Sequence, residues 1–225
     1  MSSDEFRAES FSLKNCDLIS IATGRKALTL SELRDHISRV SIDSIYHHFW
    51  GGLMSARFEE REFNNDFAFW CRRHLHEPAL AEKLAVIDPV GHLDLEALRE
   101  ELLENIEDKL DESESVRWLH ASRPFEFIRS QLVIFDTGTQ LSHPHELAEV
   151  MPDMPTGSIF YHFIDARRRL EGGENDFSYW LACFGEPYEM MRQKLSEIDP
   201  FFSSLTQVRD ELSRVCRESL EWGVL

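Results

Sequence analysis

Two histidines recur in the same sequence context and are the first candidates for chemistry. They occur in the stretches SIYHHFWGG and SIFYHFIDA, and an Asn-Asp-Phe sequence follows each stretch. A carboxylate that orients an imidazole produces a general base or a metal ligand. A buried histidine on an apolar helix face equally needs hydrogen-bond partners for its ring nitrogens, and we favour this second interpretation, a clamp between two helices. The candidate pairs are His48 with Asp66 and His162 with Asp176.

Further polar and aromatic side chains recur beside these pairs. An asparagine precedes each aspartate, a tyrosine lies one or two residues before each histidine, and a tryptophan follows each aspartate after four residues. Such groups bind a ligand or complete a structural clamp. They are Asn65, Asn175, Tyr46, Tyr161, Trp70 and Trp180.

Motifs of other chemistries are absent from the sequence. There is no G-x-S-x-G nucleophile motif, no H-E-x-x-H zinc motif and no glycine-rich phosphate loop. The pairs His74/His76 and His143/His145 fall at non-equivalent places, and we interpret them and His47 as surface histidines. We expect no bound metal and no cofactor. This pattern favours a non-enzymatic protein over an enzyme.

Composition and charge exclude several classes of protein. The chain has 225 residues, 42% of them hydrophobic, and a formal net charge of −17. This charge opposes binding to nucleic acid phosphates, which requires clustered Lys and Arg. No apolar run approaches the roughly 20 residues that span a bilayer, and the start MSSDEFRAES is unlike a secretory leader. Four widely spaced cysteines indicate reduced thiols. We therefore predict a cytoplasmic protein without a nucleic-acid or membrane partner.

The two histidine stretches belong to a longer internal repeat. Residues 11–49 lie over 125–163 without a gap, at an offset of 114 positions. Later motifs recur in the same order with small gaps, as in NDFAFW and NDFSYW, KLAVIDP and KLSEIDP, or LREEL and VRDEL. We predict two tandem homologous units, 8–112 and 122–222, joined by the connecting segment 113–121 and related by a pseudo-twofold axis.

Each unit is predicted to be mainly helical (α+β) with a small β element near its start. The runs CDLISIAT and QLVIFDT are apolar and partly β-branched, and predict a strand or hairpin that ends in a turn at Gly24 or Gly138. Helices follow from the 3.6-residue spacing of apolar positions. We expect one of them to begin at Ser44 or Ser158 as N-cap, and the next to be capped by Asp66 or Asp176. A long acidic helix ends each unit.

The order of these motifs resembles that of a bacterial and archaeal family of unknown function. The segments FSLKNCDLISIATGRKALTLSEL, SIYHHFW and NDFAFW provide the match, which covers nearly the whole chain as two units. The resemblance implies no catalytic residue and no cofactor, because no activity of the family is established.

We expect a non-enzymatic protein that binds a protein partner or regulates an enzyme, because a duplication readily creates a paired surface. The first alternative is a metal-dependent or acid/base enzyme built on the repeated His/Asp pairs. A further alternative is a carbohydrate-binding accessory protein, since aromatic and acidic side chains suit sugar rings. The sequence is also compatible with a homo-oligomer.

Overall fold

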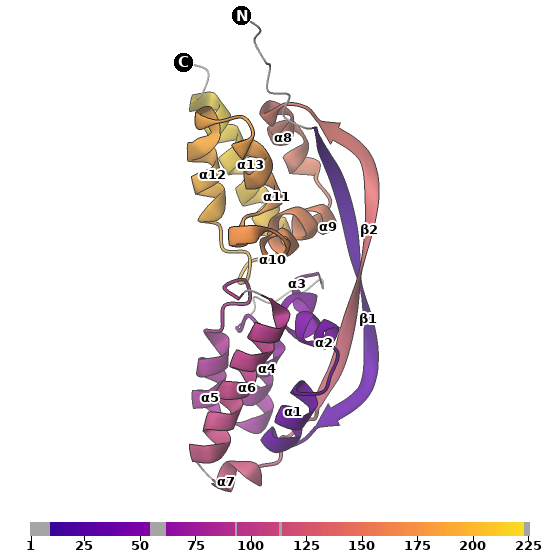
Figure 1. Ribbon diagram of the computed structural model, residues 1–225, viewed down its shortest axis with the longest axis vertical. Coiled ribbons are helices and arrows are strands. Elements are labelled where there is room, and N and C mark those ends of the chain that lie inside the picture. Colours follow the sequence, from indigo (N-terminus) through magenta and orange to yellow (C-terminus); the bar gives the residue numbers. More distant parts are fainter. Residues whose placement is uncertain (1–9, 55–61, 93, 113, 223–225) are drawn as a thin grey trace, which may run out of the picture. The chain divides into compact units, whose positions relative to one another are not determined.

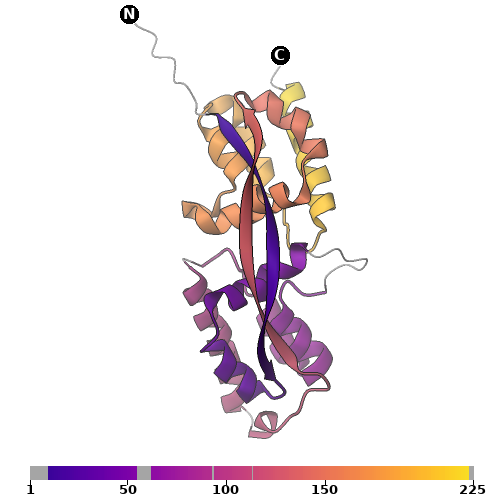
Figure 2. The same ribbon diagram turned by 90° about the vertical axis from the view of Figure 1, so that its right-hand side faces the viewer.

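The computed structural model describes residues 10–54, 62–92, 94–112 and 114–222. Its elements confirm a mainly helical fold with one small sheet. The sheet has two strands, β1 (Phe11–Ala27) and β2 (Phe125–Leu141), which run in opposite directions (Figure 1). Each strand has 17 residues and is longer than the apolar run that predicts it. The ribbon is strongly twisted, as a two-stranded sheet is expected to be (Figure 2).

Gly24 and Gly138 lie inside the strands and not in turns, so the predicted turns are wrong. Both glycines have φ +75°, a conformation that side chains disfavour. A glycine of this kind within a strand marks a bulge, which bends the ribbon without ending it. The preceding threonine hydroxyls donate to carbonyls of the neighbouring strand, Thr23 to Phe127 and Thr137 to Leu13, both at 2.6 Å.

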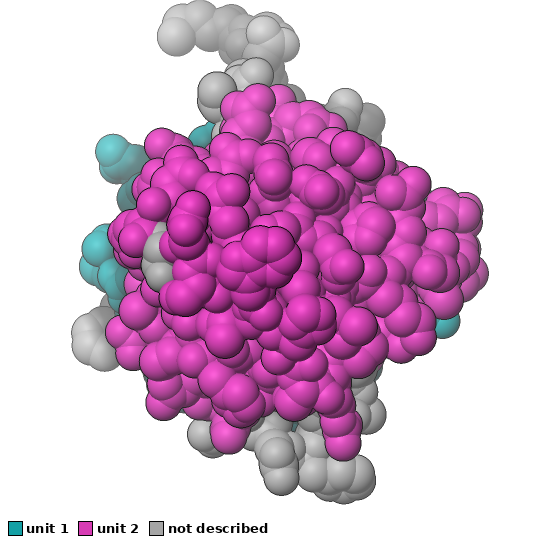
Figure 3. All heavy atoms as spheres, turned by 90° about the horizontal axis from the view of Figure 1, so that it is seen from below, with its two compact units in different colours: residues 1–17, 134–225 teal, residues 18–133 magenta. Residues whose placement is uncertain are grey.

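The chain forms two compact units, which Figure 3 distinguishes by colour. One contains the described residues up to Asp17 and from Ile134 onward, and the other contains those from Leu18 to Val133. The division crosses both strands, so each unit combines a part of β1 with a part of β2. The predicted units 8–112 and 122–222 are segments of sequence, and their boundaries remain a prediction.

In the unit from Leu18 to Val133, the helices pack on one side of its part of the ribbon (Figures 1 and 2). Its helices are α1 (Leu30–Ile37), α2 (Ile42–Tyr46), α3 (Gly52–Met54), α4 (Asp66–Trp70), α5 (Pro78–Ala85), α6 (Leu95–Glu112) and α7 (Glu114–Arg117). Two π-helical segments continue helices: His47–Gly51 joins α2 to α3, and Cys71–Leu75 extends α4. The core contains large aromatic side chains, among them Phe49, Trp50, Phe67 and Phe127.

The other unit has a similar set of helices. They are α8 (Pro144–Val150), α9 (Thr156–Ile159), α10 (Ala166–Arg169), α11 (Asp176–Ala182), α12 (Glu189–Ser196) and α13 (Leu205–Trp222). The segment Phe160–Asp165 between α9 and α10 is π-helical, and short 3₁₀ turns cover Met151–Asp153, Glu171–Gly173 and Glu186–Tyr188. Among the helices within the described ranges, none combines the length and apolar character that a bilayer span requires.

The predicted N-caps Ser44 and Ser158 are wrong. The helices begin earlier, with Ser41 and Pro155 at the cap positions. Ser44 is fully buried instead, and its hydroxyl donates to the carbonyl of Ile128 in β2 at 2.7 Å. The serine thus fastens the helix to a strand, a role that the local sequence does not distinguish from capping.

Candidate functional site

His48 lies in the π-helical segment after α2 and is 3% exposed. Its Nδ1 is 3.0 Å from Oδ2 of Asp66, and its Nε2 accepts the backbone N–H of Ile128 in β2 at 3.2 Å. Because a backbone N–H only donates, Nε2 holds a lone pair and Nδ1 carries the proton. The neutral ring therefore joins α4 to β2 and has no unoccupied nitrogen.

His162 repeats this arrangement in the other unit. Its Nδ1 is 2.7 Å from Oδ2 of Asp176, and its Nε2 accepts the backbone N–H of Lys14 in β1 at 2.8 Å. Lys14 and Ile128 occupy equivalent positions at the offset of 114. Each histidine of the sequence motif therefore binds the strand that begins the other predicted repeat.

Aromatic rings surround both imidazoles. His48 packs against Phe125, with ring centroids 4.6 Å apart, and against Phe67 at 5.2 Å. His162 packs against Phe11 at 4.8 Å and Phe177 at 5.6 Å. These rings exclude water from the imidazoles, which strengthens each hydrogen bond and raises the cost of breaking it.

The asparagines, and not the aspartates, cap α4 and α11, so the prediction that Asp66 or Asp176 caps these helices is wrong. Oδ1 of Asn65 accepts the N–H of Ala68 at 2.8 Å, and Oδ1 of Asn175 accepts that of Ser178 at 2.9 Å. Each Asn-Asp pair therefore divides two tasks. The asparagine begins the helix, and the aspartate at its first residue holds the histidine.

The four remaining candidates pack beside the clamps. The Tyr46 ring stacks on Trp50, and the indole N–H of Trp70 donates to the carbonyl of Arg123 at 2.8 Å. Trp180 packs against Phe11, with centroids 5.4 Å apart. Tyr161 is half-buried, and burial raises the pKa of its hydroxyl against the opposing effect of a nearby arginine. Trp70 and Trp180 are therefore parts of the aromatic core.

His47 is buried, so its assignment to the surface is wrong. Its Nδ1 hydrogen-bonds the hydroxyl of Ser130 in β2 at 2.5 Å. Burial, and then neighbouring His48, lower its pKa to about 4 despite the nearby carboxylate of Asp66. Together these residues form a candidate metal triad: His47, His48 and Asp66 each place one ligand atom within 4.8 Å of the others.

The bonds of His48 argue against a metal at this triad. A metal-bound histidine usually donates its second N–H to an oxygen acceptor. A metal on Nδ1 of His48 would place a proton on Nε2, which faces the N–H of Ile128. Two donors would then oppose each other in a buried position, so the observed contacts fit a structural clamp better than a metal centre.

A charged network that sequence reasoning missed supports the second clamp. The Arg169 guanidinium contacts Oδ2 of Asp165 at 2.9 Å and Oδ2 of Asp176 at 3.0 Å, and lies 4.2 Å above the Tyr161 ring centre. Asp165 is fully buried and also pairs with Arg168 at 3.1 Å. The i,i+3 and i,i+4 spacing of these charges is the only sequence signal for the network.

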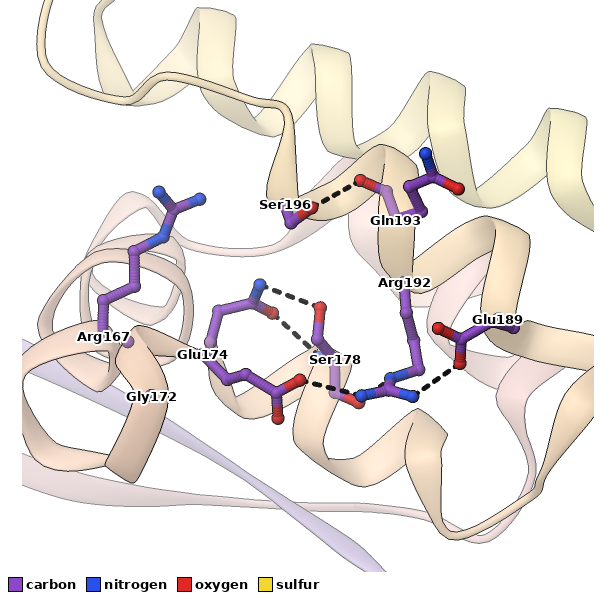
Figure 4. Close-up of a pocket in the computed structure, with 10 residues that line it drawn as sticks. Arg167, Gly172, Glu174, Ser178, Glu189, Arg192, Gln193 and Ser196 are labelled. Atoms are coloured by element: carbon purple, nitrogen blue, oxygen red, sulfur yellow. Dashed lines mark hydrogen bonds and ion pairs between the residues drawn. The ribbon is translucent and has the colours of Figure 1, made fainter.

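One cavity of about 340 Å³ lies in the unit that contains α10 to α12 (Figure 4). Arg192 crosses it and donates to Glu174 at 2.8 Å, to Glu189 at 2.7 Å and to the carbonyl of Ser178 at 3.1 Å. Asn175 is the one sequence-predicted residue in its lining. The lining residues are Arg167, Gly172, Gly173, Glu174, Asn175, Ser178, Glu189, Arg192, Gln193 and Ser196.

Comparison with known proteins identifies a family and one related structure. The model of a family described as "Family of unknown function (DUF5752)" matches residues 8–217, which confirms the resemblance seen in the sequence. The chain is also similar to the solved structure of OrfY from Thermoproteus tenax. That match has 27% identity and a TM-score of 0.79, and covers 96% of this chain and 98% of the other. No curated protein matches.

Proposed function

The chain belongs to the family of unknown function DUF5752, and from this premise we propose that it is a non-enzymatic protein that binds a protein partner or regulates an enzyme. The supporting observation is that the fold uses both ring nitrogens of His48 and of His162. A general base needs a lone pair that faces its substrate. In both residues that lone pair accepts a strand N–H, so the repeated pairs serve the fold.

In this proposal the chain consists of two tandem homologous units with a pseudo-twofold relation. The strands begin and end at positions 114 apart, and Glu32 and Glu146 accept equivalent pairs of backbone N–H groups. The contact of His48 with Ile128 is matched by that of His162 with Lys14. Such reciprocity, in which i contacts j and j contacts i, is typical of twofold symmetry. A cytoplasmic location is consistent with four free cysteines.

Affinity capture followed by reconstitution tests this role. The full chain captures partners from native lysate, and each candidate is purified and titrated into the chain by calorimetry. We expect stoichiometric binding that His48→Gln and His162→Gln leave unchanged once both variants are shown to be folded. Substrate turnover that disappears in a folded His48→Gln or His162→Gln variant would instead establish the enzyme alternative.

Carbohydrate binding is a second candidate function, and the cavity beside Arg192 favours it. Two arginines and two glutamates line the cavity, so their formal charges cancel. Amide and hydroxyl groups add both donors and acceptors. Such a lining suits a neutral polyhydroxylated ligand better than an ion. Among the described residues that line the cavity, however, none is aromatic, so they do not provide the stacking surface that the sequence prediction assumed.

Saturation-transfer NMR with neutral mono- and disaccharides tests this second function. We expect a bound sugar to give signals that Glu174→Gln weakens, because the substitution removes a charged acceptor and disturbs Arg192. Gln207→Ala on α13, outside the cavity lining, is the matched control. Signals that are absent, or equal in both variants, would exclude the cavity as a sugar site.

A further inference from the structure

The unit that contains α8 to α13 includes one short segment from much earlier in the sequence. Of the described residues before Ile134, only residues 10–17 belong to it. This segment ends with the first part of β1, which lies beside β2 (Figure 1). The side chains of Phe11, Leu13 and Cys16 are buried in the unit. We call residues 10–17 the arm, because they complete the core of a unit that otherwise begins at Ile134.

The unit holds the arm by an aromatic ring and by the backbone. The centroid of the Phe11 ring lies 5.6 Å from that of Phe177 and 5.4 Å from that of Trp180. The N–H of Lys14 donates to Nε2 of His162 at 2.8 Å. A bound strand is commonly recognised in this way, with hydrogen bonds to its main chain and pockets for alternate side chains. The arm therefore occupies its site as an added strand would.

Further contacts bring the arm backbone close to β2 and α9. The hydroxyl of Thr137 donates to the carbonyl of Leu13 at 2.6 Å, and Sγ of Cys16 donates to the carbonyl of Gly157 at 3.2 Å. Gly157 permits this approach, because a Cβ at its position would overlap the Cys16 carbonyl oxygen. All these partners of the arm follow Ile134 in the sequence. The contacts therefore do not depend on which copy of the chain supplies the arm.

The equivalent segment of the other unit, residues 124–131, is fixed more firmly. The chain before it is held in the same unit, where the N–H of Ala121 donates to the carbonyl of Leu28 at 2.7 Å. Residues 124–131 therefore cannot leave their unit alone. The arm continues into the other unit after Asp17, so it separates from its site when β1 opens at one place, between Asp17 and Leu18.

We propose that two copies of this chain form a dimer by exchanging their arms, so that the Lys14 N–H of each copy donates to His162 of the other. Exchange of an identical element is a low-cost route to a dimer, because the same contacts form between chains instead of within one chain. Each second clamp is then completed by the partner copy. The inference goes beyond the proposed binding of a different protein, since the occupant of the arm site is a second copy.

Protein concentration and salt decide between monomer and dimer. Both states hold the arm through the same contacts, so exchange competes when chains fold together near the effective concentration of an arm on its own chain, on the order of millimolar. The net charge of −17 on each copy opposes association, and salt screens this repulsion. We expect dimers after the full chain is refolded at near-millimolar concentration in salt, and monomers after it is refolded from dilute solution. Sedimentation velocity measures both.

Two variants refolded together show whether the dimers exchange their arms. Lys14→Pro removes the donor from the arm, and His162→Phe removes its acceptor. Proline suits this place because the lost N–H bonds His162 and leaves the ladder to β2 unchanged. In a mixed exchanged dimer one clamp is intact and the other lacks both groups, which costs less than two clamps that each lack one. We expect roughly 70% or more of the dimers to be mixed in native mass spectrometry, with one chain isotope-labelled.

Wild type refolded with His162→Phe is the matched control. Mixing restores no clamp in that pair, so about half of its dimers should be mixed. Two results would overturn the inference. One is the absence of dimers after wild type is refolded at near-millimolar concentration in salt. The other is a mixed share of about half in the test pair, as expected for copies that associate without exchange. Circular dichroism verifies folding, and Phe11→Leu replaces Lys14→Pro if the proline variant does not fold.

Discussion

Replacing His162 by phenylalanine measures the clamp directly, because the substitution keeps an aromatic ring and removes both hydrogen bonds. The bond to Asp176 involves a charged acceptor and contributes about 1.5–3 kcal/mol, and the bond from the Lys14 N–H contributes about 0.5–1.5 kcal/mol. In the variant, the Asp176 carboxylate and the Lys14 N–H each lose their hydrogen bond to the ring. We expect a loss of about 2–4 kcal/mol in the free energy of unfolding, or roughly 5–15 °C in Tm for a chain of this size.

His48→Phe is the matched comparison and should cost less. Its hydrogen bonds are longer, at 3.0 and 3.2 Å, and Asp66 is 33% exposed where Asp176 is 15% exposed. The free energies follow from urea denaturation monitored by circular dichroism, with Tm from calorimetry. A catalytic histidine is often held at a cost in stability. Phenylalanine variants as stable as the wild type, or more stable, would refute the clamp and favour a functional site.

Three further predictions follow from individual contacts. Gly157→Ala should destabilise the chain by about 3 kcal/mol or more in denaturation, because an added Cβ would overlap the backbone carbonyl oxygen of Cys16; an unchanged midpoint would contradict this packing. The pKa of His47 is about 4 in the folded chain and about 6.5 when unfolded, so its contribution to stability is complete above pH 6.5 and declines as the pH falls toward 4. His47→Phe should weaken that pH dependence of the urea midpoint, and equal slopes would show that His47 does not cause it. Zinc titration monitored by calorimetry should give no stoichiometric binding, and tight binding that His48→Phe abolishes would assign a metal to His47, His48 and Asp66.

Local patterns predicted the helices well and the partners of their side chains poorly. Capping rules predict the start of α4 and α11 to within one residue, although the asparagine and not the predicted aspartate is the cap, and the mainly helical fold follows from apolar spacing. The strands extend further than predicted because their outer parts alternate weakly and include Thr-Gly pairs that bend a strand without ending it.

The environment of His47 could not be derived from helical geometry. On a regular α-helix, adjacent residues point about 100° apart, which would place His47 away from the face of His48. The π-helical turn changes this angle, and Ser130 comes from a strand 83 positions later in the sequence. Arg169 and Asp176 likewise meet only after α10 and α11 are positioned. These contacts depend on tertiary structure, which a single sequence does not encode in any local pattern.

Because each clamp binds the strand of the other predicted repeat, neither clamp can form early in the synthesis of the chain. Lys14 leaves the ribosome early, but its N–H acceptor, His162, is made 148 residues later. Likewise, Ile128, whose N–H donates to Nε2 of His48, is made 80 residues after His48. Until then β1 has no native partner strand, and unpaired strands of this kind attract chaperones or aggregate. A gene fragment that encodes either predicted half alone would therefore yield a chain whose clamp has no strand to hold.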